Sequence, residues 1–314
     1  MTARLLFRHE TILAVLTVIA LFVLSMLSDK FFTVDNLLNQ GRLMSEVGLV
    51  ALAMTFVIVT GGIDLSVGSI LGLTAILFGI FWQGLGLPIP LAMAAAIASG
   101  TFAGFVNGLI ITRFSVPPLI ATLATLALYR GLAEGISQAR SVRGYPEWFF
   151  FFGQGEVLGV PFQLWILGIC TVIAAVILGY TPFGRATYAI GANETAARFS
   201  GIRVDAVKLW IYTAAGFMSA LAAVIFVSRV TTTRSDMGTG LELDVITGVV
   251  LGGTSIFGGK GTILGTALGL ILIQALKNGL ALSGVKGDGT IVVIGVVLIA
   301  AILIGAVFDR NRGG

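Results

Sequence analysis

Few side chains in this 314-residue sequence are able to carry out chemistry, and one of them lies in an unexpected place. The stretch TGGIDLSVGS, residues 60–69, sets Asp64 close to glycines inside an otherwise apolar run. A carboxylate there either caps the helix that follows, by accepting from the amides of Ser66 or Val67, or faces a path for a polar solute. The sequence leaves both functions open.

The two glycines before Asp64 indicate a break between helices. A break that faced lipid would leave backbone donors and acceptors without partners, so it must lie at a membrane surface or beside a cavity lined by protein. We therefore assign four residues to a helix break that is a candidate part of a translocation path: Gly61, Gly62, Asp64 and Ser66.

A glycine-rich stretch nearer the C-terminus, GGTSIFGGKGT at 252–262, resembles a phosphate-binding loop only superficially. The residue five positions before Gly259 is Thr254, and Gly261 stands where Ser or Thr would bind magnesium. A single cysteine, Cys170, excludes a disulfide framework and a cysteine-based metal site. We expect no catalytic residue, no cofactor and no metal in this chain.

The elements that must position these residues are membrane spans. Hydrophobic residues make up 57% of the chain and charged residues 11%, against roughly 25% charged in a soluble domain. Apolar runs of about 20 residues, the length that crosses a bilayer, recur along the sequence. We predict an all-α, polytopic transmembrane helical bundle that forms one domain over 1–314. Its ten spans are expected at 11–27, 43–60, 65–82, 91–111, 118–136, 162–179, 208–227, 243–257, 262–280 and 290–308.

The net charge of +4 comes from basic residues that are scattered over the polar connections. They form no basic patch, which excludes nucleic-acid binding. Basic residues are somewhat more frequent on the side of the two termini, so the positive-inside rule predicts that both termini are cytoplasmic.

Glycines recur every four residues in two regions, where a neighbouring helix could approach closely inside the bundle or between subunits. They are Gly100, Gly104 and Gly108, and Gly261, Gly265 and Gly269. Polar residues within the spans either line a path or form bonds between helices, and Arg130 and Glu134 are spaced to pair. These polar residues are Asn107, Arg130, Glu134, Gln274, Lys277 and Asn278.

A short helix is expected in the long connection at 180–207. Asn193 can cap its start, ETAARFS continues it, and Gly201 can close it in the left-handed conformation. This helix would lie on the same side of the membrane as the termini.

Four stretches together resemble the permease subunits of ribose-type ABC sugar importers. They are VIVTGGIDLSVGS (57–69), VPPLIATLATLALYRG (116–131), FGRATYAIGANETAARFSGI (183–202) and ELDVITGVVLGGTSIFGGKGTILGT (242–266). The similarity extends over nearly the whole chain and implies the ABC importer permease fold. In that family two permease subunits form the pore, two cytoplasmic ATPases drive it, and a periplasmic solute-binding protein delivers the sugar.

The resemblance implies that the segment 193–202 docks on the ATPase, which would bind the ATP and magnesium. Its coupling residues would be Asn193, Glu194, Ala196, Ala197, Arg198, Phe199, Gly201 and Ile202. The alternative is a polar connector that lies against the lipid headgroups. The chain would be a non-catalytic subunit in the bacterial inner membrane, paired with an identical or paralogous permease. Its cargo would be a monosaccharide or related small polyol, similar to ribose, rhamnose or autoinducer 2.

Two alternatives from other classes remain. A gradient-driven secondary transporter would place ionisable residues at broken helices, and such residues are sparse here. A non-transporting scaffold would leave the segment 193–202 without a function. The chain also departs from the family at Ala124, often glycine, and at 284–295, where many members have an aromatic residue and glutamines. The second departure argues against a simple assignment of ribose.

Overall fold

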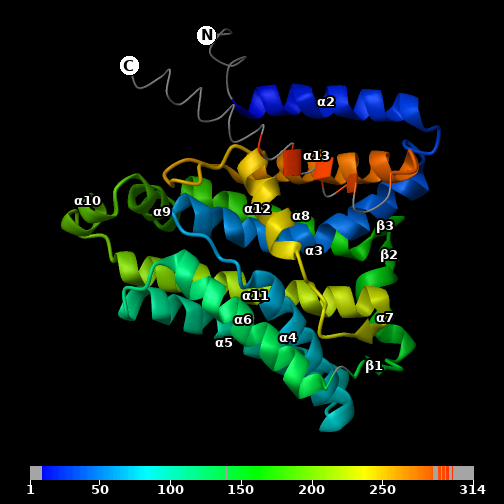
Figure 1. Ribbon diagram of the computed structural model, residues 1–314, viewed down its shortest axis with the longest axis horizontal. Helices are drawn as coiled ribbons and strands as arrows, with labels where there is room; N and C mark the ends of the chain where they lie inside the picture. Colours follow the sequence, from blue (N-terminus) through cyan, green and yellow to red (C-terminus); the bar gives the residue numbers. More distant parts are fainter. Residues whose placement is uncertain are drawn as a thin grey trace.

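In the computed structural model the chain is a bundle of α-helices, which confirms the predicted class (Figure 1). The structure describes residues 9–138 and 140–285, together with 289, 290, 292, 293, 295, 296 and 299. The helices are α2 (His9–Leu27), α3 (Val34–Val59), α4 (Val67–Gly79), the π-helical turn η1 (Ile80–Gly84), α5 (Ile89–Arg113), α6 (Pro118–Ser137), α7 (Glu147–Gln154), α8 (Phe162–Tyr180), α9 (Pro182–Ala192), α10 (Glu194–Phe199), α11 (Val204–Val230), α12 (Leu241–Leu251) and α13 (Ile263–Leu282). Two antiparallel strand pairs join β1 (Val142–Arg143) to β4 (Thr232–Thr233) and β2 (Glu156–Val157) to β3 (Val160–Pro161).

Among the residues that the structure describes, seven helical segments are long and apolar enough to cross a membrane: α3, α4 with η1, α5, α6, α8, α11 and α13. Helix α2 contributes a shorter apolar stretch, Leu13–Met26. These segments account for eight of the predicted spans, with ends that differ by a few residues and with α3 beginning nine residues earlier than predicted. The tenth predicted span, 290–308, lies mostly outside the described residues.

The predicted span 243–257 is wrong in length, because α12 contains only 11 residues. At 1.5 Å per residue it reaches about 16 Å, roughly half the thickness of the hydrocarbon core. The run of apolar residues continues past Leu251, but Gly253 adopts a φ of 87° that ends the helical backbone. The chain then forms an irregular loop over 252–262 before α13 begins.

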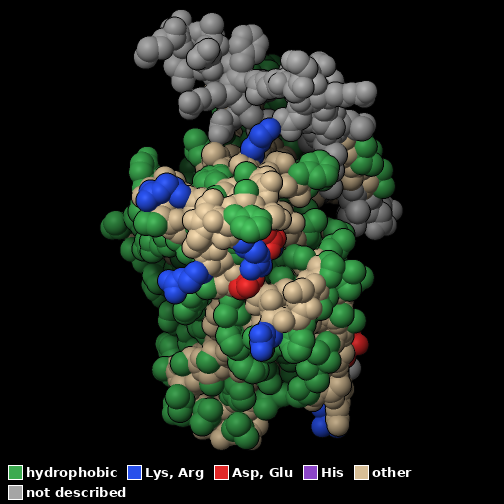
Figure 2. Space-filling model, turned by 90° about the vertical axis from the view of Figure 1, so that its left-hand side faces the viewer, with side chains coloured by type: hydrophobic (Ala, Val, Ile, Leu, Met, Phe, Trp, Pro, Cys, Tyr) green, Lys and Arg blue, Asp and Glu red, His purple; other side chains and the backbone are tan. Residues whose placement is uncertain are grey.

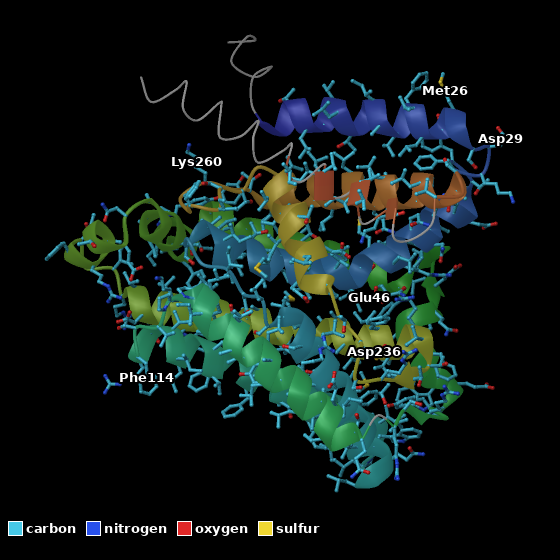
Figure 3. The ribbon with its side chains drawn as sticks, viewed as in Figure 1. Met26, Asp29, Glu46, Phe114, Asp236 and Lys260 are labelled. Carbon is cyan, nitrogen blue, oxygen red and sulfur yellow. The ribbon has the colours of Figure 1, made fainter. Side chains whose placement is uncertain are left out.

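The two ends of the bundle differ in structure. One end carries α9, α10 and the loop 252–262, and the other carries α7 and the strand pairs (Figure 1). Figure 3 shows Phe114 and Lys260 toward the first end and Asp29 at the second. We call these ends the α10 end and the strand end.

The core lies around α3, α4 and α11, whose buried side chains are mostly apolar. Helix α5 packs closely on α11, because Gly104 lies against the backbone of Gly216. Helix α13 packs on α12 in the same way, with Gly265 and Gly269 against Gly252. The glycine spacing noted in the sequence therefore serves packing inside the bundle.

Candidate functional site

Helix α10 has the capped form expected from the sequence. The side-chain Oδ1 of Asn193 accepts from the amide of Ala196 at 2.9 Å. At the other end Gly201 adopts a φ of 84°, and the amide of Ile202 donates to the carbonyl of Ala197 at 3.1 Å. The helix is short, but both of its ends are satisfied by hydrogen bonds.

Ion pairs fix α10 to the start of α11. Arg198 donates to Glu194 at 3.1 Å and to Asp205 at 2.5 Å, and Lys208 donates to Glu194 at 2.5 Å. Partial burial raises the pKa of Glu194, but the hydrogen bonds and charges of Lys208 and Arg198 outweigh it and hold that pKa below its ordinary value. Hydrogen bonds to Asp205 and Glu194 raise the pKa of the Arg198 guanidinium above its ordinary value. The segment is therefore held in one position by charge as well as by capping.

The structure corrects the expectation for Ala197, which we named as a coupling residue where a partner could approach closely. Ala197 is buried against Ile190 and Val204, because this face of α10 packs on α9 and α11. Ile202 is partly buried against the same cluster, whereas Ala196 and Phe199 face outward. The outward face of α10 is thus smaller than the sequence indicated.

Among the described residues, three phenylalanines are exposed at the α10 end. On this face Figure 2 shows hydrophobic and basic side chains, with acidic side chains between them. Phe199 is 88% exposed, Phe257 in the loop 252–262 is 85% exposed, and Phe114 follows α5. We call this surface the aromatic-basic face, formed by Phe114, Phe199, Phe257, Arg185, Arg203 and Lys260. Exposed aromatic and arginine side chains together are typical of a protein interface.

The loop 252–262 and α9 belong to one packed unit. The amide of Gly259 donates to the carbonyl of Val59, the last residue of α3, at 2.9 Å. The hydroxyl of Tyr188 in α9 donates to the carbonyl of Gly261 at 2.6 Å. The aromatic-basic face is therefore connected directly to the end of a central helix.

The helix break near Asp64 is a buried hydrogen-bonded cluster. Oδ1 of Asp64 accepts from the amide of Ser66 at 2.9 Å and from its hydroxyl at 2.6 Å. Asn107 donates to the hydroxyl oxygen of Ser66 at 2.7 Å, and Tyr129 donates to Asn107 at 3.2 Å. The expected hydrogen bond from the amide of Ser66 to Asp64 is therefore present, but Asp64 is not the N-cap: α4 begins at Val67 and not at Leu65, and its N-cap is Ser66.

The two glycines of the helix break near Asp64 lie in different environments. Gly61 is exposed with a φ of 78°, and Gly62 is buried against the hydroxyl of Tyr212. The side chains of Asp64 and Ser66 are fully buried, so a solute would reach them only after the helices separate. A part in translocation for these four residues stays a prediction.

Bonds between helices account for most of the other polar residues in the spans. Gln274 donates to Gln40 at 2.7 Å, and Lys277 pairs with Asp244 at 2.6 Å. The expected pairing of Arg130 with Glu134 is wrong. The guanidinium of Arg130 instead donates to the carbonyls of Ser235, Met237 and Gly68, and so ties α6 to the loop 231–240 and to α4.

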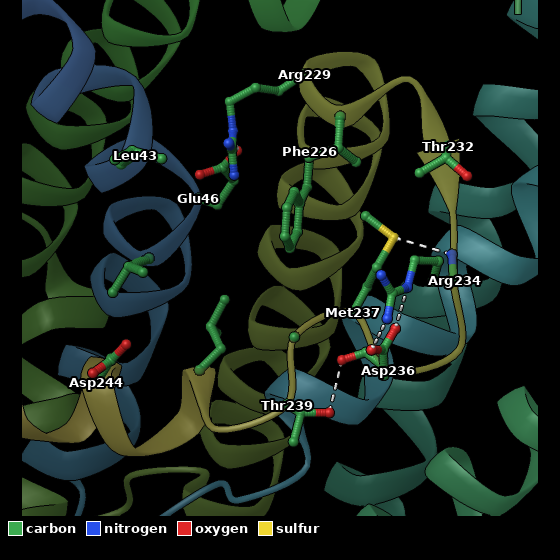
Figure 4. Close-up of a pocket in the computed structure, with 14 residues that line it drawn as sticks. Leu43, Glu46, Phe226, Arg229, Thr232, Arg234, Asp236, Met237, Thr239 and Asp244 are labelled. Atoms are coloured by element: carbon green, nitrogen blue, oxygen red, sulfur yellow. Dashed lines mark hydrogen bonds and ion pairs between the residues drawn. The ribbon is translucent and has the colours of Figure 1, made fainter. Parts of the chain in front are cut away.

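A polar cavity of about 440 Å³ opens between α3, the end of α11, the loop 231–240 and the start of α12 (Figure 4). Its charged lining residues come from all four elements and are Glu46, Arg229, Arg234, Asp236 and Asp244. Glu46 is buried and accepts from Nε of Arg229 at 2.7 Å. Sequence reasoning missed Glu46, although it is the only acidic residue in the predicted span 43–60.

The cavity lies where the backbone is irregular within the bundle. Helix α11 ends at Val230, and the loop 231–240 leads to the short helix α12, which begins inside the bundle. Irregular backbone at membrane depth is stable only where protein buries it or where it lines a water-filled cavity. Here Arg130 binds one side of the loop and the cavity lies on the other.

The molecule thus combines a bundle of apolar spans with a polar cavity toward one end and the exposed aromatic-basic face at the other, an architecture that suits a membrane permease. Residues 36–302 match the family described as branched-chain amino acid transport system / permease component, and the chain belongs to this family. Together with the ribose import relatives described next, this membership confirms the resemblance that the four motifs indicated.

Individual relatives cover almost the whole chain. The ribose import permease protein RbsC of Escherichia coli K12 is 41% identical over 303 residues, which cover 95% of this chain and 94% of that protein. RbsC of Bacillus subtilis 168 is 43% identical over 297 residues, covering 94% and 90%. The autoinducer 2 import system permease protein LsrD of Escherichia coli O9:H4 is 36% identical over 306 residues, covering 96% and 92%. No solved structure matches the chain.

Proposed function

We propose that this chain is the membrane subunit of an ATP-driven importer that carries a monosaccharide or related small polyol into the cytoplasm. Relatives named for the import of ribose and of autoinducer 2 support this class of cargo. The observation that carries the proposal is the aromatic-basic face, where the anchored helix α10 presents an exposed Phe199.

Coupling requires a contact that is both stiff and exposed. Capping and ion pairs hold α10 firmly on α9 and α11, so a force on Phe199 reaches the bundle without being absorbed by a flexible connector. The exposed phenylalanines supply apolar contact area, and the surrounding arginines and lysine suit an acidic rim on a partner. The partner we propose is a cytoplasmic ATPase, which would bind the ATP and the magnesium.

The proposal includes the rest of the assembly. The chain would act as one permease domain over 1–314, with a second permease subunit, identical or paralogous, completing the pore. A periplasmic solute-binding protein would deliver the cargo at the strand end. The α10 end and both termini would be cytoplasmic, in a bacterial inner membrane.

The test is uptake by the reconstituted complex. The chain is purified together with its copurifying ATPase, placed in proteoliposomes with ATP on the α10 side, and given the binding protein and labelled D-ribose or L-rhamnose on the strand side. Uptake that needs hydrolysable ATP supports the importer. Uptake without ATP that stops when an ion gradient is collapsed would instead support a secondary transporter.

A further inference from the structure

We propose that the cavity between α3, α11, the loop 231–240 and α12 binds the transported solute, and that the site takes an uncharged, polyhydroxylated molecule. This inference rests on the proposed function and deepens it, because it assigns a site on the permease chain itself.

The charges on the cavity wall cancel in pairs. Glu46 pairs with Arg229 at 2.7 Å. Arg234 and Asp236 form a two-point pair, with Nε to Oδ1 at 2.9 Å and Nη2 to Oδ2 at 2.5 Å. The remaining acid, Asp244, pairs at 2.6 Å with Lys277 of α13.

This pairing selects against a charged ligand. An anion or a cation would have to compete with a partner that is already in place, whereas a hydroxyl group needs no counter-charge. Carboxylates and guanidinium groups still have free capacity as acceptors and donors, so a molecule with several hydroxyl groups can bind to both. Once Lys277, which lies behind the wall, is counted with Asp244, the cavity is rich in hydrogen-bonding groups and has no net charge.

The volume of the cavity and its apolar lining residues suit such a ligand. A volume of about 440 Å³ lies within the range of small-molecule sites. The ring of Phe226 lines the cavity beside Arg229, whose Cζ lies 4.9 Å from the ring centroid. Because Arg229 covers one face of the ring, the rest of the ring, together with Leu43 and Val47, gives the carbon skeleton of a sugar its apolar contact while the polar groups bind its hydroxyls.

Hydrogen bonds fix the conformation of the loop 231–240, which forms one wall of the cavity. The Arg130 guanidinium donates to the carbonyls of Ser235 and Met237, at 2.5 and 2.9 Å. Thr239 donates to the carbonyl of Asp236 at 2.7 Å. The polar groups of the loop are thereby positioned before a ligand arrives, which lowers the entropy cost of binding.

The test uses cysteine protection in the assembled complex. Cys170 is replaced by alanine, and a single cysteine is introduced by Thr239→Cys at the cavity or, as the matched control, by Leu158→Cys in the β2–β3 turn. Leu158 is 89% exposed at the strand end and does not line the cavity. A membrane-impermeant maleimide is added from the strand side with D-ribose, L-rhamnose or the acid D-ribonate.

We expect the transported sugar, at ten times its dissociation constant, to slow labelling at position 239 about tenfold. Labelling at position 158 should be unchanged, and D-ribonate should not protect position 239. Protection by D-ribonate equal to that by D-ribose would overturn the assignment to uncharged ligands. Failure of the maleimide to reach position 239 in the complex would also overturn the proposal, because the cavity would then be covered.

The uptake and labelling experiments together distinguish an error in this inference from an error in the proposed function. If ATP-dependent sugar uptake is intact but no transported sugar protects position 239, the cavity is not the site and the importer stands. If sugar protects position 239 but uptake does not depend on ATP, the site stands and the importer is wrong.

Discussion

Glu46 of α3 and Arg229 of α11 form an ion pair inside the bundle, with Nε of Arg229 donating to Oε1 of Glu46 at 2.7 Å. The side chain of Glu46 is 4% exposed and that of Arg229 is 22% exposed. Loss of either partner would leave the other charge largely buried without compensation, which destabilises a fold.

The first prediction follows from this pair. Glu46→Gln should lower the free energy of unfolding by about 2–3 kcal/mol, since Arg229 is left without its counter-charge. The matched control is Glu156→Gln, which breaks the more exposed pair with Arg42 and should cost at most about 1 kcal/mol. Thermal unfolding in detergent compares the two variants. Equal losses would mean that burial adds nothing to the Glu46 pair.

The second prediction concerns the helix break. Gly61→Leu places a side chain at a φ of 78°, which costs about 1–2 kcal/mol, and Gly62→Leu drives one into the hydroxyl of Tyr212. Asp64→Asn keeps the Oδ1 acceptor for the amide of Ser66. Uptake per assembled complex should therefore fall further in the glycine variants than in Asp64→Asn. The reverse order would mean that the charge of Asp64 is used in transport.

The third prediction tests the docking of α10. Phe199→Asp should reduce copurification of the ATPase about tenfold or more, because it replaces an exposed apolar contact with a charge. Leu158→Asp, which is equally exposed at the strand end, should leave copurification unchanged. Ala197→Glu is a poor test, since it would disrupt the packing of α10 itself. Full copurification with Phe199→Asp would place the ATPase contact elsewhere.

The fourth prediction concerns pH. The pKa of Glu194 is lower in the folded chain than its ordinary value of 4.5, so its pairs with Lys208 and Arg198 contribute full stability above pH 4.5. That contribution is lost as the pH falls through the folded pKa. Hydrogen exchange of amides 194–202, corrected for the intrinsic rate, should be stable from pH 7 to 5 and rise below pH 4.5. Glu194→Gln should remove this rise, and an unchanged rise would mean that other groups cause it.

Local signals in the sequence were sufficient to predict the long helices and α10. Apolar runs define spans because lipid requires them, and the cap at Asn193 and the closing Gly201 act within a few residues of the helix. The Asx-type contact of Asp64 with the amide of Ser66 is also local, which is why it could be anticipated.

Contacts between distant segments could not be predicted in this way. Glu46 and Arg229 are 183 positions apart, and nothing in either neighbourhood indicates the other. The burial of Ala197 depends on how α9 and α11 surround α10. The end of α12 at Leu251 depends on a glycine conformation inside a run whose composition suits a longer helix.

Helix α3 extends without a break between the strand end and the α10 end of the protein. Its last residue, Val59, accepts the hydrogen bond from Gly259 in the loop that carries Phe257 and Lys260. Glu46, on the cavity wall, lies thirteen residues earlier in the same unbroken helix, about 20 Å along its axis. If a partner protein displaces that loop, the unbroken helix would transmit the displacement to the cavity wall without a flexible segment in between.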